Sequence, residues 1–222
     1  MSSNKTLVLA AGRGLSMDGI HKLKLTVPGY SETIKERIIR QFHGVLSIVV
    51  GYRAAELISE WPDQNYIYNH RWFETGSATS AALGLRSMAE PDVVTIMPSD
   101  LIFSDEMAKI INEEVQDTIF LCNTENRSKA SVNVELREGK IVGHYRGAKR
   151  DGRDLEAIGV VKLSNKESVQ AVVNKCESDS SLYFVEAFLD SDLQLKAIEL
   201  PFDYSEINSV EDYYQLWKKT ND

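Results

Sequence analysis

The residues best suited to chemistry in this sequence follow directly after three apolar runs. The runs are Thr6–Ala10, Val45–Val50 and Val93–Met97, each with the length and composition of a buried strand. The segments that follow them are Ala11-Gly12-Arg13-Gly14, Gly51-Tyr52-Arg53 and Pro98-Ser99-Asp100. Open parallel sheets bind ligands beyond the carboxyl ends of their strands. We therefore expect the three segments to converge on one site.

The first segment has the composition of a phosphate-binding loop. Its glycines allow backbone N–H groups to turn toward one anion, and Arg13 adds a guanidinium suited to phosphate oxygens. A dinucleotide fingerprint would need a third glycine where Met17 stands, and the Gly-Lys-Ser/Thr of a Walker A loop is absent. The turn could also serve only strand–helix packing. Lys22 and Lys24 follow in a polar stretch, where either could reach a triphosphate or lie at the surface.

A magnesium site is the chemistry that the acidic segments suggest. Asp100 stands at the end of a buried strand, and Mg²⁺ in polyphosphate sites takes one or two protein carboxylates together with substrate phosphates. Glu206-Ile207-Asn208 offers a second oxygen ligand just before the last predicted helix. The alternatives are ordinary structural roles, with Asp100 in a turn or a helix cap and Asn208 as a cap.

The elements that must position these residues alternate between strands and helices. Serines are expected to cap four helices: Ser31, Ser77, Ser104 and, in a capping box with Glu167, Ser164. Two further helices are predicted at Ala54–Glu60 and Ser209–Lys219. The remaining predicted strands are Tyr66–Tyr68, Thr118–Cys122, Ser131–Leu136, Lys140–Tyr145, Ile158–Leu163 and Leu193–Leu200.

This order of elements predicts an α/β fold. Strand–helix–strand units up to Cys122 indicate a parallel sheet covered by helices on both faces. The second half is richer in strands and predicts a mixed-sheet extension. No repeat or low-complexity linker separates the halves, so residues 1–222 are expected to form a single domain.

Composition excludes several classes of protein. The 222 residues carry 25 Lys and Arg against 33 Asp and Glu, a net charge of −8, which argues against a nucleic-acid partner. No apolar run is long enough to span a membrane, and the N-terminus does not resemble a signal peptide. Cys122 and Cys176 are isolated and expected to be reduced core residues. We expect a cytoplasmic protein, either a monomer or a homodimer.

Taken together, the motifs resemble the nucleotidyltransferases that join an NTP to a phosphorylated sugar, alcohol or amine. Leu9-Ala10-Ala11-Gly12-Arg13-Gly14 matches the family's L-A-A-G-x-G, and His21–Val27 matches P-K-x-L-x-x-V, which selects Lys22 over Lys24. Asp100 matches the first metal aspartate, and Ser205–Tyr213 matches Y-E-I-D-S-x-x-D-Y, with Asn208 at the second metal position. The resemblance implies a Rossmann-like three-layer α/β/α sandwich of the nucleotide-diphospho-sugar transferase type. It assigns nucleotide binding to 1–125 and acceptor and second-metal binding to 126–222.

Within that family, the chain looks most similar to cytidylyltransferases that act on phosphocholine or small phosphonates. Their base- and ribose-binding segments resemble stretches here that contain Gly51, Tyr52, Gly76, Ser77 and Ser80, and Ser99 is expected to join this nucleotide site. Tyr183–Asp190 resembles their acceptor segment. Phe184 and Phe188 with Glu186 would suit a choline or aminoethyl cation. Lys149, or Arg146, is expected to cover the acceptor phosphate.

The resemblance implies transfer of CMP from CTP to a small phosphorylated or phosphonate acceptor, with Mg²⁺ as cofactor. Arg13 would hold the β- and γ-phosphates, and Lys22 would bridge the α-phosphate and the acceptor. Two positions depart from the family pattern: Ser16 replaces the usual arginine, and Asn208 the usual aspartate. One alternative is a sugar-1-phosphate nucleotidyltransferase that uses UTP, dTTP or GTP. A second is a nucleotide-binding module with impaired catalysis.

Overall fold

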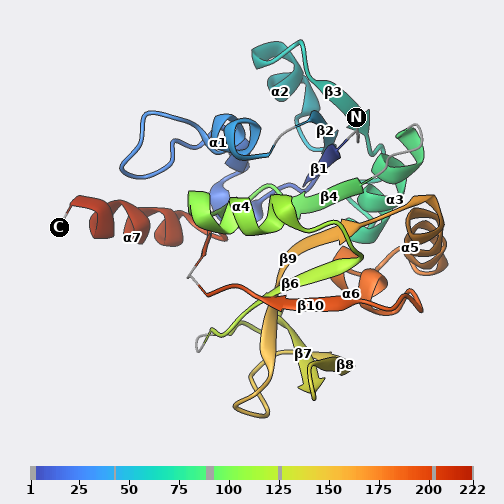
Figure 1. The fold of residues 1–222 in the computed structure, drawn as a ribbon. Coiled ribbons are helices and arrows are strands. Elements are labelled where there is room, and N and C mark those ends of the chain that lie inside the picture. The colour runs from blue at the N-terminus through green and yellow to red at the C-terminus, as the bar shows by residue number, and fades with distance from the viewer. Residues whose placement is uncertain (1–3, 43, 89–92, 125–126, 202–203, 222) are drawn as a thin grey trace.

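A computed structural model describes residues 4–42, 44–88, 93–124, 127–201 and 204–221. Its main feature is a nine-stranded sheet, seven of whose strands lie in the order β10-β6-β9-β4-β1-β2-β3. These strands are β1 (Asn4–Ala10), β2 (Val45–Val50), β3 (Asn65–Tyr68), β4 (Val93–Pro98), β6 (Thr118–Cys122), β9 (Leu155–Leu163) and β10 (Lys196–Glu199). The two others, β7 (Val132–Arg137) and β8 (Lys140–Arg146), form a hairpin, and β7 pairs with β9. The hairpin extends below the rest of the molecule in Figure 1.

Strand direction changes where the second half of the chain enters the sheet. The strands β4, β1, β2 and β3 are mutually parallel, as predicted. The later strand β9 inserts between β4 and β6 and runs antiparallel to both. Because of this reversal, the first residues of β9 lie near the carboxyl ends of the parallel strands. The predicted mixed sheet is confirmed.

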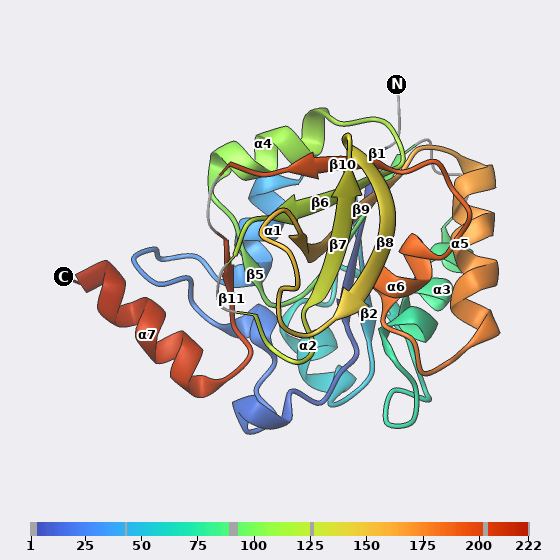
Figure 2. The same ribbon diagram turned by 90° about the horizontal axis from the view of Figure 1, so that it is seen from below.

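Helices cover both faces of the sheet. They are α1 (Ile34–Gln41), α2 (Ala54–Glu60), α3 (Ser77–Ser87), α4 (Asp105–Glu113), α5 (Lys166–Ser178), α6 (Phe184–Leu189) and α7 (Val210–Asn221). Side chains alternate along β1, so Leu7 packs in the core under α3, α5 and α6, and Val8 packs in the core under α1, α2 and α4. Figure 2 shows α3, α5 and α6 on one side of the strands and α1 and α4 on the other. The predicted three-layer α/β/α architecture is confirmed.

Three of the predicted helix caps are wrong by one or two residues. Thr33, rather than Ser31, caps α1, because Glu36 is correctly spaced to complete its capping box. Asn165, rather than Ser164, caps α5 through Ser168 N–H. The third correction is at α3, where the N-cap is Gly76 and Ser77 is the first helical residue. Ser104 caps α4 as expected, accepting from Met107 N–H.

The C-terminal segment contributes a small strand and a projecting helix. β11 (Ser205–Glu206) pairs antiparallel with β5 (Leu101–Ile102), and α7 then extends away from the sheet (Figure 1). Tyr213 contacts the core and donates from its hydroxyl to Thr26 O at 2.8 Å, whereas Tyr214 is exposed. In the parts of the chain that the structure describes, no helix combines the length and apolarity needed to cross a bilayer.

Candidate active site

A cavity of about 600 Å³ lies beyond the carboxyl ends of β1 and β4. Two of the three predicted segments meet there, since the cavity is lined by residues of the Leu9–Gly14 loop and by Pro98, Ser99 and Asp100. The third segment, Gly51–Arg53, does not line the cavity but lies behind Trp72 and Ala11, which do. Residues from β7, β9, α6 and β11 complete the lining, so the cavity draws on both halves of the chain.

The glycine-rich loop presents backbone to the cavity. Leu9, Ala10, Ala11, Gly12 and Gly14 all line it. Gly14 adopts a left-handed conformation with φ of +57°, which explains the glycine. A Cβ on Gly12 would meet nothing within 4 Å, so the glycine leaves room for a ligand to approach the backbone.

Arg13 lies outside the cavity lining. Its guanidinium carbon is 5.7 Å from the centroid of the Tyr52 ring, a cation–π contact at the protein surface. The structure therefore directs the side chain of Arg13 toward Tyr52 and away from the cavity.

Lys22 and Asp100 form an ion pair inside the cavity. Lys22 Nζ lies 2.8 Å from Asp100 Oδ2, and both side chains are largely buried, at 15% and 16% exposed. Lys24 instead pairs with Glu60 at 2.7 Å, outside the cavity. Of the two candidate lysines, Lys22 is thus the one at the site. The other oxygen of Asp100, Oδ1, is buried and accepts no hydrogen bond within the described residues.

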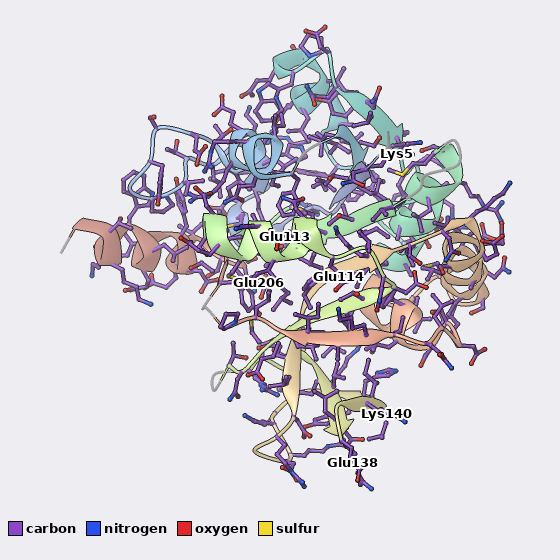
Figure 3. The ribbon with its side chains drawn as sticks, viewed as in Figure 1. Lys5, Glu113, Glu114, Glu138, Lys140 and Glu206 are labelled. Atoms are coloured by element: carbon purple, nitrogen blue, oxygen red, sulfur yellow. The ribbon has the colours of Figure 1, made fainter. Side chains whose placement is uncertain are left out.

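The short β5–β11 pair brings the second acidic segment to Asp100. Ile207 N–H donates to Asp100 O at 3.0 Å, which places Glu206 and Asn208 at the cavity wall. Figure 3 shows Glu206 near the middle of the molecule, below α4. Burial, and next the charge of Asp100, raise the pKa of Glu206 to about 7, while a hydrogen bond from Asn208 opposes that shift.

These oxygens suit a divalent cation. Asp100 Oδ1 lacks a donor, and the side chains of Glu206 and Asn208 line the same cavity. Carboxylate and amide oxygens are ligands that Mg²⁺ prefers. Among the residues that the structure describes, no three His, Cys, Asp or Glu side chains form a complete metal cage. An ion here would therefore need oxygens from a substrate, which is typical of Mg²⁺ at polyphosphates.

The predicted base and ribose residues divide into two groups. Gly76, Ser77, Ser80 and Ser99 line the cavity. Two of their hydroxyls already bind within the protein: Ser77 Oγ accepts from Phe184 N–H at 2.9 Å, and Ser80 Oγ accepts from Asn69 Nδ2 at 3.0 Å. At Gly76 a Cβ would lie 2.3 Å from Leu182 O, so a larger residue would push this wall apart.

Gly51 and Tyr52 support the wall from behind. A Cβ on Gly51 would lie 2.5 Å from the Cβ of Trp72 and 2.7 Å from Ala11 O. Tyr52 N–H donates to Ala11 O at 3.0 Å, and its ring meets the Trp72 ring edge-on at 5.2 Å. Trp72 itself lines the cavity. Gly51 and Tyr52 thus fix the glycine-rich loop against Trp72 and do not themselves face the cavity.

The predicted aromatic cage for the acceptor is not formed. Phe184 lines the cavity, but Phe188 is fully buried in the core beneath α6. Glu186 is 8% exposed and accepts from Arg146 Nε at 2.5 Å and from Arg146 Nη2, so its charge is already neutralised. Positions 184 and 188 are four apart on a helix, and this shared face packs inward.

The two cations expected to cover the acceptor also lie elsewhere. Lys149 Nζ donates to Asn123 Oδ1 at 2.7 Å and does not line the cavity. The Arg146 guanidinium lies over the ring of Tyr183, 4.1 Å from its centroid, and Tyr183 lines the cavity. Arg146 therefore supports the wall of the cavity through Tyr183.

Several cavity residues were not predicted as site residues. Trp72, Ser131, Glu156, Tyr183 and Tyr204 all line the cavity. Glu156 had one signal in the sequence: it is a lone acidic residue among the apolar residues that form β9. Tyr183 begins the segment that resembles an acceptor segment, and the other three could not be distinguished from ordinary loop or core residues.

Comparisons of the sequence with known proteins find similar nucleotidyltransferases. The profile of the MobA-like NTP transferase domain matches residues 6–158. The bifunctional protein GlmU of Methanococcus aeolicus is 25% identical over 167 residues, which cover 72% of this chain and 40% of that protein. The chain thus matches less than half of the length of this relative.

Two solved structures have the same fold over nearly the whole chain. The CTP:phosphocholine cytidylyltransferase LicC from Streptococcus pneumoniae superposes with a TM-score of 0.74 at 17% identity, covering 98% of this chain and 99% of that chain. A putative glucose-1-phosphate thymidylyltransferase from Bacillus anthracis has a TM-score of 0.74 at 14% identity, covering 99% and 96%. At these identities the likeness establishes the fold and leaves the nucleotide open. The profile covers well over half of the sequence and includes the glycine-rich loop, Lys22 and Asp100, so this chain belongs to the MobA-like NTP transferase domain family.

Proposed function

We propose that the protein transfers CMP from CTP to a small phosphorylated or phosphonate acceptor and releases pyrophosphate. The observation that carries the proposal is the Lys22–Asp100 ion pair, which lies between the glycine-rich loop and the Glu206–Asn208 segment. One cation and several oxygen ligands thus surround the position where an α-phosphate would lie. The cytidylyl specificity and the choice of acceptor rest on the resemblance of the base-binding segments and on the fold shared with LicC.

The reaction is an in-line displacement at the α-phosphorus. An oxygen of the acceptor phosphate or phosphonate attacks, the bond to the bridging oxygen of the β-phosphate breaks, and pyrophosphate leaves with that electron pair. The attacking oxygen is already ionised at neutral pH, so no strong general base is needed. Catalysis therefore consists of positioning and charge neutralisation.

Each side chain has a role in that scheme. The Gly12–Gly14 backbone binds the β- and γ-phosphates, and Lys22 holds the α-phosphate and the incoming acceptor oxygen together. Asp100, Glu206 and Asn208 would hold Mg²⁺, which when bound supplies charge neutralisation at the phosphates. Arg13 reaches the outer phosphates only if its guanidinium leaves the Tyr52 ring.

A sugar-1-phosphate acceptor with UTP, dTTP or GTP is the second candidate. It is supported by the fold shared with the putative thymidylyltransferase. A third candidate, a binding module with impaired catalysis, is supported only by Ser16 and Asn208. One screen separates all three: pyrophosphate release from four NTPs with Mg²⁺, each offered phosphocholine, 2-aminoethylphosphonate, 2-hydroxyethylphosphonate and several sugar 1-phosphates.

Asp100→Asn tests the role of the cavity carboxylate. We expect pyrophosphate release to fall by about 100-fold or more, because the variant removes the charge that pairs with Lys22 and would bind the metal. Asp63→Asn, at an exposed aspartate outside the cavity, is the matched control and should leave the rate unchanged. Full activity of Asp100→Asn would refute the assignment.

A further inference from the structure

The charges that line the cavity do not balance. Among the described lining residues, three carry carboxyl groups, Asp100, Glu156 and Glu206, and Lys22 alone carries an ammonium or guanidinium group. Asp100 is paired with Lys22, and Glu206 lies beside Asn208 in the group suited to Mg²⁺. Glu156 is the carboxylate that the proposed phosphate and metal chemistry leaves unused.

Glu156 is buried and has no cationic partner in the described residues. It is 7% exposed, and the hydroxyl of Thr124 donates to its Oε2. No Lys or Arg of the described chain forms an ion pair with it, in contrast to Glu186, which is neutralised by Arg146. Burying an unpaired carboxylate is costly, so a charge at this position favours binding a cation from outside the chain.

A tyrosine belongs to the same side of the cavity. Tyr204 and Glu156 both line the cavity. Glu156 and Ile158 lie on the same face of β9, and both Ile158 and Tyr204 belong to the core under α1, α2 and α4. A carboxylate beside a tyrosine ring combines charge pairing with cation–π attraction, which suits an organic ammonium group.

We propose that Glu156, with the Tyr204 ring, binds a positively charged head group on the acceptor and thereby selects cationic acceptors over neutral ones. The inference rests on the proposed function, because it assumes that the acceptor occupies this cavity. It replaces the predicted Phe184–Glu186–Phe188 cage with residues on a different wall. The expected substrate class is a phosphate or phosphonate monoester that carries an amino or quaternary ammonium group.

Matched acceptors test the charge requirement directly. Phosphocholine is compared with 3,3-dimethylbutyl phosphate, in which carbon replaces the quaternary nitrogen. 2-Aminoethylphosphonate is likewise compared with 2-hydroxyethylphosphonate. For the wild type, we expect kcat/KM to favour the charged member by about 10- to 100-fold, in the range of a charge-assisted contact with a cation–π contribution.

Glu156→Gln should remove most of that preference. Its amide can still accept from Thr124, so the fold should persist, as circular dichroism and thermal melting will check. We expect KM for the charged acceptor to rise by about tenfold or more with little change in kcat, and kcat/KM for the neutral isostere to stay within about threefold. Tyr204→Leu should reduce the same preference, and Tyr204→Phe should preserve most of it.

Glu138→Gln is the matched control. Glu138 is exposed at the tip of the β7–β8 hairpin, does not line the cavity and lies well away from Glu206, which does (Figure 3), so the substitution should change neither kinetic constant. Two outcomes would overturn the inference: a wild type that accepts both isosteres equally, or a Glu156→Gln variant that needs more Mg²⁺ with both acceptors alike, which would make Glu156 a metal ligand. Absence of pyrophosphate release with every NTP and acceptor would instead refute the proposed function.

Discussion

Ser16 and Asn208, the two positions that depart from the family pattern, contact each other. The Ser16 hydroxyl donates to the backbone carbonyl of Asn208, across 192 positions of sequence. The pattern that the sequence resembles has an arginine and an aspartate, of opposite charge, at these positions, and this chain has a neutral residue at each. The net charge near Asp100 is therefore the same as with that pair, and a neutral hydrogen bond connects the segment after the glycine-rich loop to the Glu206–Asn208 segment.

Asn208→Asp should strengthen metal binding. The new carboxylate adds a charge beside Asp100 and Glu206, so we expect the Mg²⁺ concentration for half-maximal activity to fall by about tenfold. Calorimetric titration of Mg²⁺ in the presence of CTP provides a second measurement. Asn174→Asp, on the exposed side of α5, is the control and should have no effect. An unchanged Mg²⁺ requirement would show that the side chain at 208 is not a ligand.

At the scale of elements, the junction of β9 with α4 contains a buried lysine. Lys162 is 1% exposed, and its Nζ donates to Asn112 O at 3.0 Å and to Glu114 O at 2.6 Å, at the carboxyl end of α4. The lysine binds carbonyls that the end of a helix leaves without partners. Burial lowers the pKa of Lys162 to about 8.

This shift predicts a stability that depends on pH. Below pH 8 Lys162 is protonated in both the folded and the unfolded state, and the buried charge lowers the free energy of unfolding. Between pH 8 and the ordinary lysine value near 10.5, Lys162 is deprotonated in the folded state but still protonated in the unfolded state. The free energy of unfolding therefore rises with pH over this range. The free energy of unfolding of the wild type, relative to Lys162→Met, should therefore increase over this window by on the order of 3 kcal/mol. Urea unfolding of both proteins at pH 7, 8.5 and 10 measures the difference, and a constant difference would contradict the prediction.

At the scale of the whole molecule, one cavity joins segments from most of the chain. Its walls come from the β1 loop, the start of α3, the end of β4, the strands β7 and β9, the helix α6 and the strand β11. A nucleotide bound there contacts both halves of the chain. Its binding should therefore raise the free energy of unfolding of both halves together.

Thermal unfolding tests this coupling. With Mg²⁺ and CTP at 100 times the dissociation constant, the free energy of unfolding should rise by about 2.7 kcal/mol. That increase corresponds to a melting temperature higher by roughly 5–10 °C for a chain of this size. Asp100→Asn should show a much smaller shift under the same conditions. A melting temperature that no NTP with Mg²⁺ can raise would argue against nucleotide binding in the cavity.

Local sequence patterns predicted the fold and brought the glycine-rich loop and Asp100 to one place. The apolar runs before Gly12 and Asp100 mark buried strands, and the topology then brings the carboxyl ends of these strands together at the cavity. The choice of Lys22 required the family motif, because both lysines lie in equally polar sequence. The structure explains that choice through the pairing of Lys24 with Glu60.

The residues around the proposed acceptor position could not be predicted in the same way. Glu186 looks available in the sequence, but Arg146, forty positions earlier on β8, neutralises it. Glu156 lies before the predicted strand Ile158–Leu163, but β9 begins at Leu155 and its reversed direction places Glu156 in the cavity wall. Both outcomes depend on long-range contacts, which local composition does not encode.

The position of β11 along the chain has a consequence for the order of assembly. All nine strands of the large sheet precede Ser205, so the sheet contains every strand it needs before β11 pairs with β5. Without that pairing, Asp100 has Lys22 beside it but lacks the Glu206–Asn208 segment of the cavity wall. Formation of the sheet and completion of the cavity are therefore separable steps, and the pairing of β11 with β5 determines when the second occurs.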